Sequence, residues 1–313
     1  MKWYLKLYLC SAALACLLLP ATFAAAQDRD WIGGGGDDLW TTGANWSGGV
    51  APTAADAARF KVDGTTTLID GSVNATASFF ELGWGGPTSA SNTINMTGGS
   101  LTAHGGLSNI GRGTNDDPAH KVEFNMSGGV IDVRGIAIPE AFDPGSSIGL
   151  NTELDVSGDS IINTGFMRLG AFNASSLVTI RDNAQINILA IGTLGFTNGS
   201  LWLESGFAGT GDGPVNSNFD IRDNAVLTVH GLHFTGTDNA ATSSIATQEE
   251  FDFYVANYVD TGLMTANGGA NFVDASFANS VMTFQVGTAI PEPSTAALLL
   301  LSCPLIMMVR RRR

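Results

Sequence analysis

Short runs of alternating apolar and polar residues recur through the middle of the chain, each interrupted by a tight polar segment. Five such lines align: INMTGGSLTAHG from residue 94, FNMSGGVIDVRG from 124, LDVSGDSIINTG from 154, VTIRDNAQINIL from 178 and FDIRDNAVLTVHG from 219. The apolar residue before each polar segment is the anchor of its line, and successive anchors are 30, 30, 24 and 41 residues apart. The anchors are Met96, Met126, Val156, Ile180 and Ile221. Alternation with a period of two predicts β-strands.

A second anchor, an aliphatic residue followed by glycine, returns in most units. It occurs at Leu82, Ile110, Ile148, Leu169 and Leu194. The longer spacing before Ile148 is explained by an insertion, AIPEAFDPG at residues 137–145, which we expect to loop out of the repeat. Between the strands, Gly-Gly and Asp-Asn pairs supply the left-handed or otherwise special backbone that a sharp corner needs.

Strands and corners that repeat without an intervening helix predict an all-β fold of stacked coils. We expect residues 65–245 to form a right-handed parallel β-helix, or β-solenoid. In this register Met126 and Val156 point inward, while Thr97 and Ser127 lie at corners. The alternative is an antiparallel β-sandwich, in which the same strands pair as hairpins. The fixed order of two different anchors favours the solenoid.

The open ends of such a stack are unpaired sheet edges, and they need to be covered. Residues 27–64 are rich in glycine and contain three tryptophans, Trp31, Trp40 and Trp46. We expect this Trp/Gly-rich segment to form an N-terminal cap or first coil.

Residues 246–289 change character. The apolar residues at positions 251, 254, 255, 258 and 259 have the spacing of an amphipathic helix. Thr247 and Glu250 form a capping box, and Gly262 ends the helix. We expect this single C-terminal helix to pack against the last coil, ahead of a final strand at residues 280–287.

The first 26 residues have the layout of a secretory signal peptide. Lys2 and Lys6 precede an apolar stretch, and small residues precede a predicted cleavage between Ala26 and Gln27. A competing interpretation is a lipobox, ALAC, that would place a lipid on Cys16. It lacks the usual branched residue three positions before the cysteine, so the cleaved signal peptide is favoured.

Residues 290–313 form a distinct tail, IPEPSTAALLLLSCPLIMMVRRRR. Its apolar run, residues 296–309, would reach about 21 Å as a helix, short of the roughly 30 Å hydrocarbon core of a membrane. By the positive-inside rule the arginines after the run stay cytoplasmic, which leaves the body outside the cell. These features alone fit either a short transmembrane anchor or a processed sorting signal.

The order of Pro-Glu-Pro, apolar run and arginine cluster resembles the PEP-CTERM sorting tail of bacterial envelope proteins. This resemblance implies recognition by an exosortase-type membrane peptidase and cleavage near Pro-Glu-Pro. The implied sorting signal comprises Pro291, Glu292, Pro293, Arg310, Arg311, Arg312 and Arg313. The spacing of aromatic residues in residues 30–60 is similar to the opening segment of secreted, autotransporter-like β-strand repeat proteins, which often carry the same tail.

Charge and cysteine content narrow the classes of function. Without the two terminal signals the chain has nine basic and 28 acidic residues, a net charge of −19. A surface this acidic argues against nucleic acid as a partner and against direct adsorption to anionic lipid. Because Cys10, Cys16 and Cys303 all lie in the terminal signals, the body has no disulfide framework, thiol catalysis or cysteine-based zinc site.

Candidate chemical groups are few. His230 and His233 are three residues apart, so in a strand they point to opposite faces and predict no shared metal site. His104 and His120 are isolated, and the usual hydrolase and nucleotide-binding motifs are absent. The sequence therefore predicts no catalytic residue, no cofactor and no metal. A carboxylate pair brought together by folding stays open as a glycosidic site.

Three further groups are candidates for binding or catalysis. We expect Arg181 and Arg222, in the two Arg-Asp-Asn corners, to lie in solvated turns; the alternative is that they pair with acids of neighbouring coils. Trp84 and Trp202 flank glycine-rich turns and are the candidates for exposed rings that stack on sugars. Polysaccharide lyases of the β-helix type use a basic residue, for which this body offers two lysines. They are Lys61 and Lys121.

The sequence thus predicts an exported, non-enzymatic structural or adhesive protein of the cell envelope, cell surface or extracellular matrix. Its expected partners are the exosortase-type peptidase and, through the tail, the membrane, to which it is anchored transiently or permanently. One alternative is an extracellular polysaccharide-binding module. A β-helix polysaccharide lyase or hydrolase is a weaker alternative.

Overall fold

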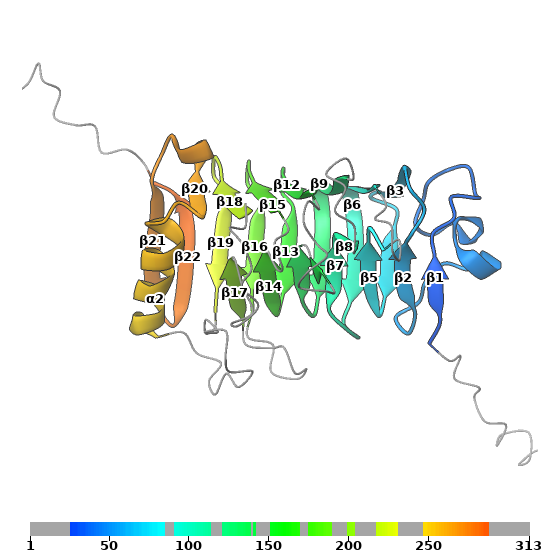
Figure 1. Ribbon diagram of the computed structural model, residues 1–313, viewed down its shortest axis with the longest axis horizontal. Coiled ribbons are helices and arrows are strands. Elements are labelled where there is room, and N and C mark those ends of the chain that lie inside the picture. The colour runs from blue at the N-terminus through cyan, green and yellow to red at the C-terminus, as the bar shows by residue number, and fades with distance from the viewer. Residues whose placement is uncertain are drawn as a thin grey trace, which may run out of the picture.

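The computed structural model describes residues 26–84, 91–113, 121–138, 140–141, 151–169, 175–189, 199–203, 217–230 and 247–287. Within these ranges the protein is all-β, as predicted, with one α-helix near the C-terminal end. Figure 1 shows the strands side by side along the long axis, from β1 (Asp28–Asp30) at one end to β21 (Val273–Ala278) and α2 (Gln248–Tyr254) at the other.

Two sheets run along this axis, and we refer to them as the short sheet and the long sheet. The short sheet has seven strands in the order β1-β2-β5-β7-β10-β14-β17, and every neighbouring pair is parallel. After β1 its strands are β2 (Ala57–Phe60), β5 (Phe79–Leu82), β7 (Ser108–Ile110), β10 (Ile136–Ile138), β14 (Phe166–Leu169) and β17 (Ser200–Leu203). A separate parallel pair joins β8 (Arg112–Gly113) and β11 (Glu140–Ala141).

The long sheet has 13 strands. Its parallel members are β3 (Thr65–Ile69), β4 (Asn74–Ala77), β6 (Asn92–Ala103), β9 (Lys121–Val133), β12 (Asn151–Val156), β13 (Ile161–Thr164), β15 (Ser175–Ile180), β16 (Gln185–Ile188), β18 (Ser217–Ile221), β19 (Val226–Val229) and β20 (Met264–Ala266). β22 (Val281–Val286) pairs antiparallel with β19 and with β21. Between successive repeats the described strands therefore pair in parallel, whereas hairpins would make them antiparallel.

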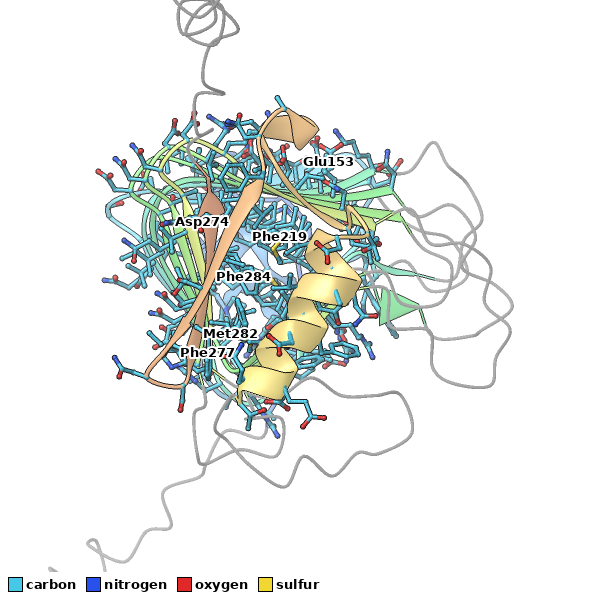
Figure 2. All side chains as sticks on the ribbon, turned by 90° about the vertical axis from the view of Figure 1, so that its left-hand side faces the viewer. Glu153, Phe219, Asp274, Phe277, Met282 and Phe284 are labelled. Atoms are coloured by element: carbon cyan, nitrogen blue, oxygen red, sulfur yellow. The ribbon has the colours of Figure 1, made fainter. Side chains whose placement is uncertain are left out.

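The five first anchors lie on one ladder of the long sheet. Their order along it is Met96, Met126, Val156, Ile180 and Ile221. Each of these side chains is at most 1 % exposed, because strand alternation turns every second residue into the interior. Figure 2, viewed along the long axis, shows Phe219 and Phe284 directed into the same interior. The predicted inward register is confirmed.

The polar segment after each anchor forms a corner with left-handed backbone. Three residues lie between Met126 and Val130, whereas four lie between their partners Val156 and Ile161 on the neighbouring strands. The tighter corner needs Gly129, because its φ is 93° and a Cβ there would lie 2.7 Å from the backbone of Gly98. The left-handed residues of the other corners in this series are Gly99, Gly158, Asp182 and Asp223. These positions confirm the role predicted for the Gly-Gly and Asp-Asn pairs.

The second anchor is confirmed in three units and wrong in two. The corresponding ladder of the short sheet reads Leu82, Ile110, Ile138, Leu169 and Leu203. Ile148 and Leu194, which the sequence pattern placed on it, lie outside the described residues. The insertion does not begin at Ala137, because Ala137 and Ile138 are buried in β10. An aliphatic residue before glycine is therefore not enough, by itself, to identify the second anchor.

Three buried tryptophans pack together at the N-terminal end. The ring centroids of Trp31 and Trp40 each lie 5.0 Å from that of Trp46, in edge-to-face geometry. All three rings pack on Phe60, with centroid distances of 5.9, 5.8 and 5.5 Å. The indole N–H of Trp46 also donates to the Trp40 carbonyl at 2.7 Å. Such aromatic clusters bury a large apolar area in a short segment, shaped here by the turns η1 (Gly43–Asn45) and η2 (Ser47–Gly49).

The predicted helix forms at the opposite end and has the predicted capping box. The Thr247 hydroxyl accepts from the backbone N–H of Glu250, and the Glu250 carboxylate accepts from the N–H of Thr247. The helix α2 continues into a π-helical turn, Val255–Val259, and the chain turns at Gly262, whose φ is 78°.

The Tyr254 hydroxyl closes the last edge of the short sheet. It accepts from the backbone N–H of Leu201 at 3.2 Å and donates to the Leu201 carbonyl at 3.0 Å. Leu201 belongs to β17, the final strand of this sheet, so one side chain pairs both polar groups of an otherwise open strand position. Burial raises the pKa of Tyr254 well above its usual value, which keeps the hydroxyl protonated and able to donate.

A hairpin closes the long sheet. The predicted final strand is confirmed as β22, but the sequence analysis missed its partner β21. The turn between them uses Asn279 and Ser280, whose φ values of 51° and 60° are both left-handed, as a two-residue hairpin turn requires. Asn-Ser is a weaker turn signal than Asn-Gly, which is why the pattern did not reveal it.

Met126→Asp should lower the melting temperature by about 10 °C or more, because it places a charge in the closed interior of the stack. Ser127→Asp is the matched control, since Ser127 is exposed at the corner one residue later. Thermal melts of the two variants and the parent protein provide the measurement. Equal melting temperatures for the two variants would contradict the register.

Candidate functional site

The residues predicted to act as signals fall at the limits of the described chain. The sorting residues 291–293 and 310–313 lie outside the described residues, as does the apolar run between them. Among the described residues, no helix is both long and apolar enough to cross a membrane. Ala26 and Gln27 are described, and Gln27 is held against β2. Its N–H donates to the Asp56 carboxylate at 3.0 Å, and its carbonyl accepts from Ala57 at 2.9 Å.

Ion pairs link neighbouring repeats on the outer face of the long sheet. The Lys121 ammonium lies 2.6 Å from Glu123 on its own strand and 2.8 Å from Glu153 on the next strand. Hydrogen bonds to Glu123 and then to Glu153 raise the pKa of Lys121, so it stays charged at neutral pH. The other lysine considered for catalysis, Lys61, lies 2.7 Å from Asp30. Both lysines are therefore engaged with carboxylates in the folded chain.

Arg181 lies in an exposed turn and also pairs with an acid of the neighbouring coil, the alternative that the sequence left open. Its guanidinium reaches back to the preceding strand and donates two hydrogen bonds to Asp155, at 3.2 and 3.1 Å. This bidentate contact raises the pKa of Arg181. Arg222, in the second Arg-Asp-Asn corner, donates to Asp220 on its own strand at 2.6 Å. The parallel register explains why Arg181 reaches an acid on the neighbouring strand. Asp155 lies directly beside Thr179, two residues before Arg181, so its carboxylate is within reach of the guanidinium.

A buried ion pair on the outer face of the short sheet was missed by the sequence analysis. The Glu81 side chain is fully buried, and Arg59 donates to it at 2.8 Å and also pairs with Asp28. The Arg59 guanidinium lies 5.6 Å from the ring centroid of Trp84. Arg59 and Glu81 directly precede Phe60 and Leu82, which pair with each other on neighbouring strands. The equal spacing from these two apolar residues is the sequence signal that could have shown Arg59 and Glu81 to be neighbours.

Trp84 is half-buried beneath Arg59, so the structure does not present it as the freely exposed ring that sugar stacking would use. The side chain of Trp202 lies outside the described residues, and its proposed role stays a prediction.

Short polar side chains form an outward ladder on the long sheet, along the segments that follow the corners. In order they are Thr76, Thr102, Asp132, Asn163, Asn187 and Thr228. The Asn187 amide donates to Asn163 at 3.1 Å and its carbonyl accepts from the Thr228 hydroxyl at 2.8 Å. Parallel strands lie about 4.8 Å apart, so the ladder presents donors and acceptors at a regular interval.

The histidines form no metal centre within the described chain. His104 lies 3.5 Å from Asp132, at the edge of the polar ladder. Burial lowers the pKa of His230, which keeps it neutral at physiological pH. His120 and His233 lie outside the described residues, so the predicted lack of a shared site at 230 and 233 stays a prediction. No group of three or more His, Cys, Asp or Glu residues in the described ranges is placed to hold a metal ion.

A groove of about 660 Å³ opens at the C-terminal end, between the helical segment and β21. Phe251, Val255 and Val259 line one wall. Phe272, which is 51 % exposed, lies on the other, and Asp274 is the acidic group on that side. Residues 247–287 contain five acidic residues and no Lys, Arg or His, so the groove offers apolar contact area in an acidic setting.

Comparison with protein-family models, with curated proteins and with solved structures gives no match to this chain. The interpretation of function therefore depends on the geometry of the described residues and on the two terminal sequences. That geometry consists of side chains paired with their neighbours along both sheets, a regular polar face and a groove at one end.

Calcium should not stabilise the protein beyond the effect of ionic strength. The acidic side chains are spread along the stack, and the described ones do not gather into the set of six to eight oxygen ligands that a calcium site needs. Melting temperatures in millimolar calcium chloride and in sodium chloride of equal ionic strength provide the comparison. A rise of many degrees in calcium alone would show an organised site and contradict this expectation.

Proposed function

We propose that the protein is a secreted, surface-sorted structural or adhesive component of the cell envelope or extracellular matrix, without enzymatic activity and without a cofactor. Its body is a right-handed parallel β-helix. The observation that carries the proposal is a pair of continuous parallel ladders, from β1 to β17 in the short sheet and from β3 to β18 in the long sheet. The stack is covered at both ends and linked across repeats by side-chain pairs. A stack of this kind holds its two ends at a fixed distance, which suits a spacer or matrix component.

The inward ladders support the β-helix assignment. Each repeat contributes two segments to the long sheet, one on either side of a corner, and one segment to the short sheet. Each segment pairs in parallel with the corresponding segment of the next repeat. Right-handed crossover between parallel strands is the rule for L-amino acids, and it supports the proposed hand.

The terminal sequences support export and sorting. The signal peptide directs the chain out of the cytoplasm, and cleavage between Ala26 and Gln27 releases the body. The C-terminal tail then holds the protein at the membrane, where an exosortase-type peptidase reads Pro-Glu-Pro. Proline on both sides of Glu292 favours an extended backbone, and an extended segment fits a protease cleft at low entropic cost.

Replacing Pro291, Glu292 and Pro293 with Ala-Gly-Ala should leave unprocessed protein in the membrane. The change removes the peptidase recognition sequence and leaves the apolar run and the arginines at residues 310–313 intact. A simple anchor would be indifferent to it. Intact-mass analysis of the membrane and surface fractions distinguishes the two cases. Sorting is wrong if the parent and the variant carry the same full-length C-terminus.

Binding of extracellular polysaccharide is the second candidate function, and the polar ladder favours it. Amide and hydroxyl groups at a regular spacing are suited to pairing with the hydroxyl groups of an extended glycan. On this alternative the long sheet, and not an aromatic site, carries the contact.

On a glycan array, a polysaccharide bound by this face should be retained several-fold less by Asn187→Ala, because that amide links two neighbouring ladder positions. Asn257→Ala is the matched control, since Asn257 is exposed on the helical segment away from the ladder. Equal retention by the parent and both variants would exclude the ladder as the binding face, and release of product from the sugar would contradict the absence of enzymatic activity.

A further inference from the structure

The residue predicted to become the N-terminus after export lies against a buried carboxylate. The backbone N–H of Gln27 donates to Asp56 Oδ1 at 3.0 Å, while the Gln27 carbonyl accepts from the N–H of Ala57 at 2.9 Å. The next residue, Asp28, opens β1 and pairs with Ala57 in register. The backbone nitrogen of Gln27 is therefore held in place at the first edge of the short sheet.

The Asp56 carboxylate is built into the fold and is not a mobile surface acid. The residue is 4 % exposed, and its Oδ2 accepts from the backbone N–H of Thr53 at 3.0 Å and from the Thr53 hydroxyl at 2.7 Å. Burial acts to raise the pKa of Asp56. The hydrogen bonds from Thr53 and Gln27, together with the charge of Arg29, outweigh burial and lower it. Asp56 is therefore ionised at neutral pH.

We propose that Asp56 is the acceptor for the α-ammonium group of Gln27, which forms when the signal peptide is removed. In the precursor, position 27 offers Asp56 one neutral amide N–H. After cleavage between Ala26 and Gln27 the same nitrogen carries a positive charge and three donors, and the hydrogen bond becomes an ion pair. This inference rests on the cleavage site given under the proposed function. It adds a structural consequence: processing completes the contact that fastens β1 to β2.

The charged groups around this nitrogen determine whether folding raises or lowers the pKa of the α-amino group. Asp56 faces it directly. Arg29, whose Nε lies 3.9 Å from Asp56 Oδ2, is a positive charge that acts to lower the pKa of the α-amino group. Asp28, on the same strand, is already paired with Arg59. The direct contact with Asp56 dominates because it is a hydrogen bond, so folding raises the pKa of the α-amino group above its usual range of about 7.7–8.0.

The resulting stability depends on pH in a defined direction. A group whose pKa is raised by folding contributes stability that is fully present below its unfolded pKa and is lost as pH rises through its folded pKa. The processed chain should therefore gain its additional stability at neutral and mildly acidic pH, and lose it in the alkaline range above about pH 8. The precursor has an amide at this position, so it lacks this dependence.

The same contact should protect Gln27 chemically. An N-terminal glutamine cyclises when its free amine attacks the side-chain carbonyl carbon Cδ. A bond forms between the α-nitrogen and Cδ, the bond from Cδ to Nε2 breaks, and a proton from the amine leaves with Nε2 as ammonia. Only the unprotonated amine is nucleophilic. Asp56 holds the amine in its ammonium form, and the folded chain should therefore cyclise slowly.

The first test compares a chain that begins at Gln27 with one that begins at Ala24, both continuing to Arg313. At about pH 6.5 the chain beginning at Gln27 should melt about 1–4 °C higher, and the difference should vanish at about pH 10. Asp56→Asn should abolish the difference at about pH 6.5. Asp70→Asn is the matched control and should leave the difference unchanged, because Asp70 is bonded to Ser72 and makes no contact with Gln27.

Two further measurements keep the proposal falsifiable if Asp56→Asn does not fold. The rate of acylation of the Gln27 amine against pH reports its pKa in the parent chain. The loss of ammonia, followed by mass spectrometry, should be several-fold slower in the native protein than after denaturation. An α-amino pKa within its usual range, or equal rates of ammonia loss, would overturn the proposal. If the exported protein begins at another residue, the cleavage site is wrong, and the experiments on the chain beginning at Gln27 still decide the role of Asp56.

Discussion

Backbone hydrogen bonding at the ends of the strand stack is the constraint on which this structure depends. Inside the stack each strand has a neighbour on both sides, but the first and last strands expose unpaired N–H and C=O groups. The chain meets this requirement differently at its two ends. A tryptophan cluster and short turns surround β1 and β2, whereas the Tyr254 hydroxyl pairs with β17 and an antiparallel hairpin pairs with β19. The reversal of direction at β22 matters, because it interrupts the parallel repeat with an antiparallel pairing that no earlier strand of the described residues makes.

The corners connect this backbone constraint to the surface chemistry. Each corner sets the register of the strand that follows, so one missing residue between Met126 and Val130 is absorbed by Gly129 and not by a shift of the ladder. Because the register is preserved, outward residues from repeats 24 to 41 positions apart meet side by side. The pairs made by Lys121 and by Arg181 are consequences of this register. They stabilise neighbouring repeats against each other at partly exposed positions, where each pair contributes modestly.

The sequence predicts the interior better than it predicts the surface, for a physical reason. Alternation with a period of two requires Met126 and Val156 to face inward, and a glycine pair after an apolar anchor has few uses other than a corner. Ile138 was missed because a strand of three residues leaves too little alternation to outweigh a nearby Ile-Gly pair. The bidentate pair of Arg181 depends on which strand lies beside it, and the contact of Gln27 with Asp56 spans 29 residues. Contacts of this kind follow from the three-dimensional register and have no local signal.

The same reasoning locates where regulation can act on such a protein. The ladders inside the stack are paired on both sides, so a change there must disturb several repeats before it alters any one of them. An end strand has one neighbour and few stabilising interactions, so a single added charge changes a large fraction of them. β1 has only three residues, which makes the contact at Gln27 a substantial part of its attachment. The proposed cleavage places the new N-terminus at Gln27, directly before β1, and β1 lies at an end of the short sheet. Under that proposal the protein couples its export to its stability without any moving part in the described body.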